Sequence, residues 1–411
     1  MKTVVLDDDP TGTQSASHVR VLLTWDADGI REALADADSV YLQTNSRALE
    51  QGAAVALSER IQGELSEALE GQEVRVVLRG DSTLRGHVFA ETERFMTPES
   101  VMIFVPAFPA GGRTTRDGIH YVAVDGHDVP AGQTEYAEDP VFPFDSSELT
   151  EYVREKSDRN PFAIPLSTVR AGGERLVQSV LAAPAGSVIV PDAVTDSDIA
   201  HIARAVEAAE ARGRRIVVRC AAPMAAELAH VRSDGLLPLP VAGPDSRVLV
   251  VCGSHTGGAT AQLAALAADY VDADVLDTDD ALADADRAGH DLAERALRHG
   301  HDVTVISSAR ERRSSDGELH HGERVMSGLI RAAREIAPHV DVVVAKGGIT
   351  SAQIARDALG ASDALVLGQI LPGVSLWRIR IFDGRELLYV VVPGNVGDAD
   401  ALVQVMRALG R

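Results

Sequence analysis

The sequence predicts an α/β protein with two domains, each a mostly parallel sheet flanked by helices. Short β-branched runs alternate with Ala-, Leu- and Glu-rich helical stretches almost throughout the chain, a pattern typical of βα units around parallel sheets. The length of 411 residues suits two domains better than one. A break rich in proline and glycine, SDGLLPLPVAGPDS at 233–246, separates two series of these units. We therefore place the domains at 1–235 and 246–411.

Strands are expected in the first half where short apolar runs precede polar turns. They are 3–6, 40–43, 75–79, 101–105, 162–165, 188–190 and 216–219. Helices such as 52–70 and 199–212 fall between most of them. The stretch 118–143 differs, because it is rich in Gly, Pro and Asp and has weak periodicity. It is predicted to form a hairpin and loop.

The second half restarts with RVLVVCGSHTGGATAQLAAL, which predicts a strand, a glycine-rich turn and an Ala-rich helix. Further strands are expected at 303–307 and 341–345. The segment 272–287 is dense in Asp and Ala and predicts a helix with a solvated face. The mixed charges of 310–324 favour a solvated loop.

Composition limits the classes of function. The net charge of −22 argues against nucleic acid or an anionic membrane as partner, although local arginines could still hold a small anionic substrate. Cys220 and Cys252 lie far apart, so neither a disulfide framework nor a thiolate metal site follows. The histidines show no metal-binding spacing, and only His120 is a weak functional candidate. With a strand at the N-terminus and no long apolar run, we expect a soluble cytoplasmic protein.

Polar side chains follow four consecutive strands predicted in the first half. In an open parallel sheet, ligands bind outside the carboxyl ends of the strands. Each group alone is weak evidence because loops are generally polar, but their coincidence on one sheet edge indicates a pocket. The residues are Asp7, Asp8, Asp9 and Thr11 after the first strand, Asn45 and Arg47 after the second, Arg79, Asp81, Ser82, Thr83 and Arg85 after the third, and Arg113 after the fourth.

This mixture of side chains suits a small hydroxylated acid. Guanidinium groups grip carboxylates through charge-assisted, often bidentate bonds, while hydroxyl and amide groups bond to substrate hydroxyls. An aspartate after the first strand, Asp8 or Asp9, could accept a proton from a substrate hydroxyl or bond to a polyol. Carboxylate recognition is assigned to Arg47, Arg79 and Arg85, and hydroxyl recognition to Asn45, Ser82 and Thr83.

Structural interpretations of the same residues stay open. The aspartate run is either solvated or supplies a negative charge that the site needs. Solvation is favoured for Asp7, since such a run needs only one or two active members. Asp81 or Ser82 could be the N-cap of a helix. Arg47 and Arg79 could form surface ion pairs.

Glycine turns in the second half suggest a phosphate site. CGSHTGG (252–258) and KGGITSAQIARDAL (346–359) each follow an apolar strand and open a helix, and VVPGNVGDADAL (391–402) repeats the theme. Glycine permits close backbone approach, and a helix N-terminus offers free N–H groups to phosphate. Neither a P-loop nor GxGxxG is present. One such turn is commonly structural, but two of them, with a polyol-type pocket in the other domain, favour a nucleotide. Ser254, Thr256 and Thr350 are candidate hydroxyl donors.

The motifs together resemble those of the four-carbon acid sugar kinase family. DDDPTG, TNSR, RGDSTLRG, VPAFPAGGRTT, VPDA, CGSHT and KGGITSAQIARDALG occur in that family's order and cover nearly the whole chain. The resemblance implies a sugar-acid-binding domain followed by a nucleotide-binding domain. It also implies transfer of the γ-phosphate of ATP to the terminal hydroxyl of a tetronic acid such as threonate, erythronate or 3-oxo-tetronate.

The resemblance also implies roles for individual residues. Its substrate site corresponds to Asp9, to Arg47 and to the stretch Arg79, Gly80, Asp81, Ser82 and Thr83. Its nucleotide site corresponds to Ser254, Gly347, Gly348, Ile349, Thr350 and Gly394. These positions fall within the groups already selected on chemical grounds.

Three positions depart from the family pattern. Pro10 replaces a usual apolar residue, which should stiffen the turn. Ile349 stands where many members have an acidic residue, so a carboxylate that would help hold Mg²⁺ is missing. Val392 and Pro393 stand where many members have a lysine. The last two departures weaken the expected nucleotide side.

The working hypothesis is in-line phosphoryl transfer with ATP and Mg²⁺ as cofactors. The arginine cluster would hold the carboxylate of the sugar acid and leave its C4 hydroxyl facing a cleft between the domains. Asp8 or Asp9 would orient or deprotonate that hydroxyl; the ligands of the metal are not predicted.

Two alternatives are kept. One is another α/β enzyme of sugar acids, such as a lyase, an aldolase or a dehydrogenase. The other is a non-catalytic sensor that binds a sugar acid and a nucleotide without turnover. The sequence does not predict the stereochemistry of the substrate, and a homodimer is compatible with it.

Overall fold

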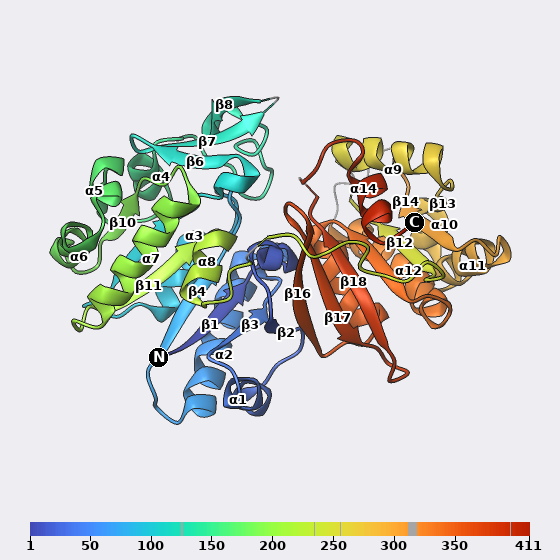
Figure 1. The fold of residues 1–411 in the computed structure, drawn as a ribbon, viewed down its shortest axis with the longest axis horizontal. Helices are drawn as coiled ribbons and strands as arrows, with labels where there is room; N and C mark the ends of the chain where they lie inside the picture. Colours follow the sequence, from blue (N-terminus) through green and yellow to red (C-terminus); the bar gives the residue numbers. More distant parts are fainter. Residues whose placement is uncertain (125, 234, 255, 311–318, 395) are drawn as a thin grey trace. The chain divides into compact units, whose positions relative to one another are not determined.

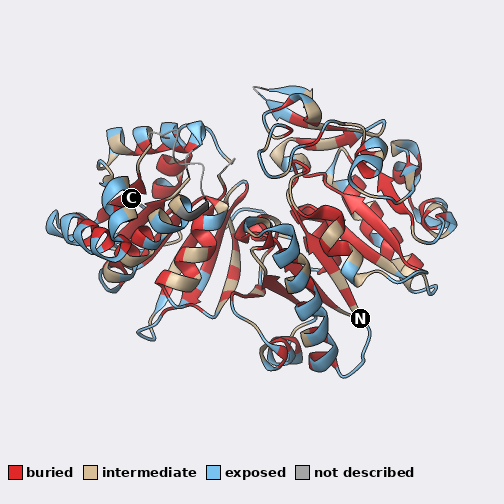
Figure 2. Ribbon diagram, turned by 180° about the vertical axis from the view of Figure 1, so that it is seen from behind, coloured by how far each residue is buried: buried red, intermediate tan, exposed pale blue. Residues whose placement is uncertain are grey.

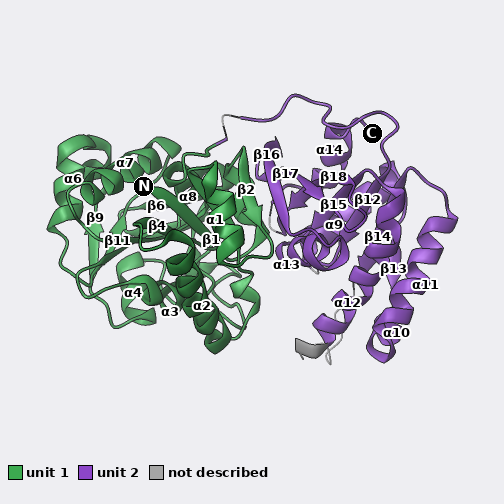
Figure 3. Cartoon of the chain, turned by 90° about the horizontal axis from the view of Figure 1, so that it is seen from below, with its two compact units in different colours: residues 1–232 green, residues 233–411 purple. Residues whose placement is uncertain are grey.

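The computed structural model describes residues 1–124, 126–233, 235–254, 256–310, 319–394 and 396–411. The chain forms two compact units, Met1–Arg232 and Ser233–Arg411 (Figure 3). In each unit the central strands of the large sheet are buried, and the helices expose their outer faces (Figure 2). The expected architecture of two α/β domains is confirmed.

Unit 1 contains a sheet of parallel strands in the order β2-β3-β1-β4-β11-β5-β10-β9 (Figure 1). All seven strands expected in the first half are present, and an additional one, β2, follows the aspartate run. The strands are β1 (Lys2–Asp7), β2 (Val19–Leu22), β3 (Ser39–Gln43), β4 (Val74–Arg79), β5 (Val101–Val105), β9 (Pro161–Ile164), β10 (Val188–Pro191) and β11 (Ile216–Cys220).

Helices cover this sheet through apolar stripes. Ile61 and Leu65 of α2 pack with Val4 and Leu6 of β1 in one core cluster, since residues four apart share a helix face and residues two apart share a strand face. The unit's helices are α1 (Ala27–Ala35), α2 (Gln51–Leu69), α3 (Val88–Thr92), α4 (Leu149–Lys156), α5 (Leu166–Ala171), α6 (Gly173–Ala182), α7 (Asp196–Glu210) and α8 (Ala222–Leu228).

A small antiparallel sheet is inserted after β5. Its strands β6 (Arg113–Arg116), β7 (Ile119–Val124) and β8 (His127–Pro130) pair in sequence order. The prediction of a hairpin in 118–143 is confirmed.

Unit 2 contains the sheet order β13-β14-β12-β15-β18-β17-β16. The first five strands are parallel, whereas β17 is antiparallel to both neighbours. The strands are β12 (Val248–Cys252), β13 (Asp274–Leu276), β14 (Val303–Ser308), β15 (Val342–Lys346), β16 (Asp363–Leu371), β17 (Val374–Arg380) and β18 (Glu386–Val392). The helices are α9 (Gly257–Asp269), α10 (Thr278–Ala283), α11 (Ala285–Arg298), α12 (Leu319–Ile336), α13 (Gly348–Gln353) and α14 (Ala401–Ala408).

The expectation of one helix at 272–287 was wrong. The segment contains β13 and then two helices, because aspartates interrupt the helical run. The Asp277 side chain accepts a hydrogen bond from the Asp280 N–H at the start of α10, and Asp284 accepts one from the Arg287 N–H at the start of α11. Asp favours the N-cap over the helix interior.

The loop expected at 310–324 is only partly described. Residues 311–318 lie outside the described residues, and α12 begins at Leu319. The last part of the segment is therefore helical and not a loop.

The topology places the candidate residues of unit 1 on one sheet edge. Strand β1 lies between β3 and β4, and β11 follows β4. Because these strands are parallel, their carboxyl ends meet at one edge, and the order reverses direction at β1. Such a switch point is where ligands bind in open α/β sheets.

Candidate functional site

The aspartate run is buried, not solvated. Asp7, Asp8 and Asp9 are 0, 2 and 2% exposed. Their common partner is Arg79, which lies opposite Asp7 in the register of β1 and β4. Its Nη1 donates to Asp7 Oδ1 at 3.1 Å, Asp8 Oδ1 at 3.2 Å and Asp9 Oδ1 at 3.2 Å. The interpretation of Arg79 as part of a surface ion pair was therefore wrong.

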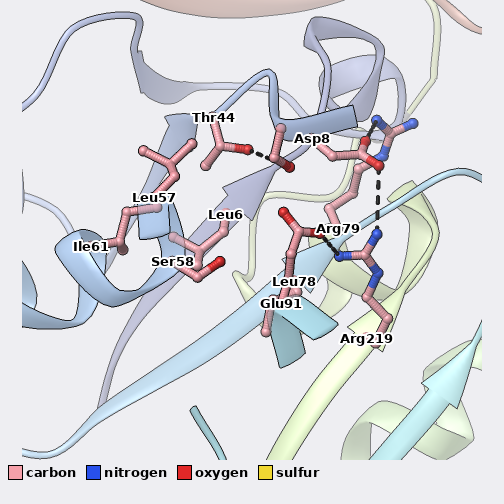
Figure 4. A pocket seen from close by; sticks show the side chains of 11 residues that line it. Leu6, Asp8, Thr44, Leu57, Ser58, Ile61, Leu78, Arg79, Glu91 and Arg219 are labelled. Carbon is pink, nitrogen blue, oxygen red and sulfur yellow. Dashed lines mark hydrogen bonds and ion pairs between the residues drawn. The ribbon is translucent and has the colours of Figure 1, made fainter. Parts of the chain in front are cut away.

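A second buried guanidinium, Arg219, was missed by the sequence analysis. It projects from β11, where its Nη1 donates to Glu91 Oε2 at 2.9 Å and its Nη2 lies 3.6 Å from Asp8 Oδ2. Figure 4 shows the Asp8 carboxylate between Arg79 and Arg219. A signal existed, since an arginine interrupts the apolar run IVVRCAA.

These four groups line a small cavity. Asp8, Arg79, Glu91 and Arg219 are its charged lining residues, and residues such as Leu57 form its apolar side (Figure 4). The internal space is about 10 Å³, which is room for about one water molecule. Without movement the cavity cannot admit a sugar acid.

Two glycines of the motifs make room for this cluster. A Cβ at Gly12 would lie 2.1 Å from Asp7 Oδ1, and one at Gly80 would lie 2.5 Å from Arg219 Nη2. Both distances are far below van der Waals contact. The glycines of PTG and RGD are therefore required by the charged side chains beside them.

The pKa of Asp7 reflects its burial. Burial raises the pKa of Asp7 to about 7, although the charge of Arg79 opposes the rise. One oxygen of Asp7 has no hydrogen-bond partner among the described residues. A partly protonated Asp7 reduces the repulsion within the run.

Arg47 closes the outer side of the run. It follows β3, and its side chain is 22% exposed. It pairs with the Asp9 carboxylate, and its Nη1 lies 3.5 Å from Asp81 Oδ1. Asp9 also accepts a hydrogen bond from the Thr11 N–H at 2.7 Å. Asp9 is therefore the member of the run whose partner reaches solvent.

The DST stretch forms a turn and not a helix start. Helix α3 begins at Val88 with His87 at its N-cap position, so the interpretation of Asp81 or Ser82 as N-cap was wrong. Asp81 bonds to Thr83, and Arg85 Nε donates to its Oδ2 at 2.9 Å. Burial tends to raise the pKa of Asp81, but Arg85 and Arg47 hold it below its usual range.

His120 supports the same turn. Its ring is buried between the Thr115 hydroxyl, at 3.0 Å, and the carbonyl of Ser82, at 2.8 Å. Burial lowers the pKa of His120 to about 4, so the ring is neutral at pH 7. The charge of Arg113 acts in the same direction. Arg113 itself begins β6, is buried and bonds to the Gly111 carbonyl.

The glycine turns of unit 2 converge on Ser254. A Cβ added at Gly347, whose φ is +112°, would lie 3.3 Å from Ser254 Cβ and 3.3 Å from Thr350 Oγ1. One added at Gly394 would lie 3.7 Å from Ser254 Oγ. Side chains larger than glycine would fill this meeting point. Sequence-predicted residues from three separate turns are thus brought together.

The remaining predicted nucleotide residues begin α13. Gly348 is its first residue, Ile349 is 50% exposed and Thr350 is buried. A side-chain hydroxyl bond links Ser254 and Thr256 at 3.3 Å. His255 and Asn395 lie outside the described residues.

Two cations beside these turns were also missed. Lys346 ends β15 and is fully buried; its Nζ donates to the carbonyl of Pro393 at 2.7 Å. Arg310, after β14, bonds to the carbonyls of Ser308, at 2.9 Å, and Ser254. Lys346 lies opposite Val392 in the register of β15 and β18. The turn therefore has a cation beside it, although position 392 is apolar.

Within the described ranges, no group of three or more His, Cys, Asp and Glu side chains is arranged to hold a metal ion. The same part of the chain contains no helix with the length and apolarity needed to span a membrane.

Two family models match most of the length of the chain. The model of the sugar-binding N-terminal domain matches residues 3–228, and that of the nucleotide-binding C-terminal domain matches residues 249–402. The fold is similar to the crystal structure of a Haemophilus influenzae protein, with a TM-score of 0.68 and 18% identity; the match covers 99% of this chain and 100% of the other. It is also similar to the crystal structure of a Salmonella typhimurium protein, with a TM-score of 0.71 and 18% identity; this match covers 100% of this chain and 99% of the other.

Curated relatives bear the names of kinases. A D-threonate kinase of Bordetella bronchiseptica is 27% identical and aligns with 98% of this chain and 96% of its own. A D-threonate kinase of Salmonella typhimurium is 30% identical, and the alignment covers 78% of this chain and 74% of the relative. A D-erythronate kinase of Heliobacterium modesticaldum is 28% identical, and the alignment covers 79% of this chain and 76% of the relative. The chain therefore belongs to the four-carbon acid sugar kinase family, a family of phosphotransferases that act on an alcohol group.

Proposed function

We propose that this sugar acid kinase transfers the γ-phosphoryl group of ATP to the C4 hydroxyl of a tetronic acid such as threonate, erythronate or 3-oxo-tetronate. The observation that carries the proposal is the buried aspartate run held by Arg79 on a sheet edge, with Arg47 at its outer side. The relatives named as kinases favour phosphoryl transfer over lyase, aldolase or dehydrogenase chemistry.

In this proposal Arg47 and Asp9 receive the substrate. The carboxylate of the acid binds the guanidinium of Arg47 and replaces Asp9, with which Arg47 pairs in the structure. The Asp9 Oδ2 that Arg47 releases then accepts the hydrogen bond of a substrate hydroxyl and takes up its proton as the hydroxyl attacks, while Oδ1 keeps its bonds to Arg79 and Thr11. Arg–carboxylate recognition is strong because two parallel bonds can form.

Neighbouring groups hold that pair in position. Arg79 keeps Asp8 and Asp9 in fixed orientations, so we assign it a positioning role and not direct contact with the substrate carboxylate. Ser82 is held by His120 through its carbonyl. We place the remaining substrate contacts at Asp81, Ser82, Thr83 and Arg113.

The nucleotide is assigned to the converging turns of unit 2. We assign its binding to Ser254, Gly347, Gly348, Ile349, Thr350 and Gly394; of these, Gly347 and Gly394 approach Ser254 closely, and Gly348, Ile349 and Thr350 are the first residues of α13. The close approaches at these glycines suit a ligand that contacts backbone. When bound, ATP supplies the phosphoryl group, and Mg²⁺ accompanies its phosphates and neutralises their charge. A cytoplasmic location and a homodimer stay predictions from the sequence.

An ADP-coupled assay with Mg²⁺ tests this proposal. The panel contains D- and L-threonate, D- and L-erythronate and 3-oxo-tetronates, and ³¹P NMR of the product locates the phosphate. Turnover with a C4 phosphate is expected for at least one acid. A folded protein that binds both ADP and an acid but turns over no acid of the panel would contradict the kinase proposal and support a non-catalytic sensor. The sensor stays an alternative because the exposed Ile349 stands where an acidic residue is expected.

A further inference from the structure

Lys346 is a buried cation whose described partners are all neutral. Its side chain is fully buried at the end of β15. The ammonium donates to the carbonyls of Pro393, at 2.7 Å, Gly394, at 3.4 Å, and Val396, at 3.5 Å. No carboxylate among the described residues forms an ion pair with it. An ammonium without a counter-charge is costly to bury.

The choice of lysine is unusual for this chain. Of the 39 basic Lys and Arg residues, only Lys2, Lys156 and Lys346 are lysines. Arginine is thus the cation used almost everywhere, including the buried positions of unit 1. A lysine differs by being compact and by losing its proton readily when buried. Its use here points to a need for one of these properties.

The surroundings of the ammonium contain few other titratable groups. From β12, the Cys252 thiol lies opposite Lys346 in the sheet register, and burial raises its pKa. Beyond it lies Arg310, which bonds to the Cys252 carbonyl at 3.4 Å. From β18, the apolar Val392 lies opposite. Burial lowers the pKa of Lys346 to about 8.

The bonded turn also contributes to the candidate nucleotide site. Gly394, whose carbonyl accepts a bond from Lys346, lies beside the Ser254 hydroxyl. A phosphate at this meeting point would be close enough to the ammonium to favour its charged form. It would supply the counter-charge that the described structure lacks.

We propose that Lys346 is a positioning residue of the nucleotide site, which holds the carbonyls of Pro393, Gly394 and Val396 and takes up a proton from solvent when a polyphosphate binds. The inference rests on the proposed nucleotide site and adds a group to it. Below the pKa of free Lys346 the ammonium is already charged, and polyphosphate binds at full strength. Above it, binding must also protonate the amine, so affinity falls with rising pH.

Lysine NMR of the full chain tests this directly. With ¹³C-labelled lysine the protein gives three side-chain Cε signals, and Lys2→Arg and Lys156→Arg variants assign two of them. The third should titrate near pH 8 in the free protein and about 1–3 pH units higher with saturating Mg-ADP. The signals of Lys2 and Lys156 should not move with ADP.

Calorimetry gives a second readout over pH 7.5–9. The dissociation constant of Mg-ADP should rise by up to about tenfold per pH unit for the wild type and for the Lys156→Arg control. Lys346→Arg keeps the charge without titrating, so its dissociation constant should stay constant over this range. If Lys346→Arg does not fold, the titration of the wild-type signal still decides.

The outcomes separate the inference from the proposed function. ADP bound with an unmoved Lys346 titration would overturn the inference and leave the nucleotide site standing. No ADP binding at any pH would overturn the nucleotide site and the inference with it. A rise in the Lys346 titration point on ADP binding supports both.

Discussion

The charged clusters of the two units differ in how their buried cations are compensated. In unit 1, Arg79 and Arg219 each face buried carboxylates. In unit 2, the hydrogen bonds of Lys346 to described residues all go to backbone carbonyls. Buried charges are tolerated when they are paired. The charges of the first cluster are therefore compensated within the chain, whereas we propose that the second gains its counter-charge from the ligand.

The largest effect is expected for Asp9→Asn. The change keeps shape but removes the carboxylate that accepts the substrate proton, so turnover should fall about 10²–10⁴-fold. The ADP-coupled assay measures this, and circular dichroism checks the fold. Asp38→Asn is the control, since the Asp38 side chain is 92% exposed. Near-normal turnover of Asp9→Asn would remove Asp9 from the chemistry.

The compensation in unit 1 can be broken at Arg219. Arg219→Met leaves Glu91 and Asp8 buried without this cation, so unit 1 should lose about 3–5 kcal/mol of stability. Urea unfolding measures the loss through the fluorescence of Trp25 in a Trp377→Phe background, because the chain has one tryptophan in each unit. Adding Glu91→Gln should restore part of it. Simple additivity of the two losses would argue against the pair.

A steric test addresses the room that glycine makes for the cluster. Gly12→Ala places a Cβ 2.1 Å from the Asp7 carboxylate and should cost about 1–3 kcal/mol in the same unfolding assay. Gly63→Ala is the matched control, since its Cβ meets no atom within 4 Å in the middle of α2. Gly63→Ala should raise the free energy of unfolding by about 0.5–1 kcal/mol. Equal effects of the two changes would show that the cluster imposes no steric demand.

The smallest effect concerns the protonation of Asp7. Its pKa is raised from 3.8 to about 7 in the folded protein, so the folded state binds the extra proton between these values and loses stability as pH rises. Between pH 5 and pH 6 the wild type should lose about 1.4 kcal/mol relative to Asp7→Asn. Urea unfolding at both pH values checks this. A constant difference between the two proteins would place the Asp7 pKa near its ordinary value.

The sequence predicted the sheet and the candidate residues at its edge, but not the partners of those residues. Apolar runs and polar strand ends located β1, β3 and β4, because both patterns are local. The sequence wrongly suggested that Asp7 was solvated, because its burial depends on Arg79 from a distant strand. Arg219 and Lys346 were missed for the same reason. Arg219 and Lys346 stand out only through contacts with residues far away in the sequence, which no local pattern predicts.

Hydrogen exchange of the full chain with each ligand alone tests the division of labour between the units most directly. A tetronate should protect peptides covering 7–15, 43–48 and 79–87 of unit 1. Mg-ADP should protect peptides covering 252–262, 346–354 and 391–402 of unit 2. Protection of the aspartate run by Mg-ADP, with no protection of the glycine turns, would contradict the account.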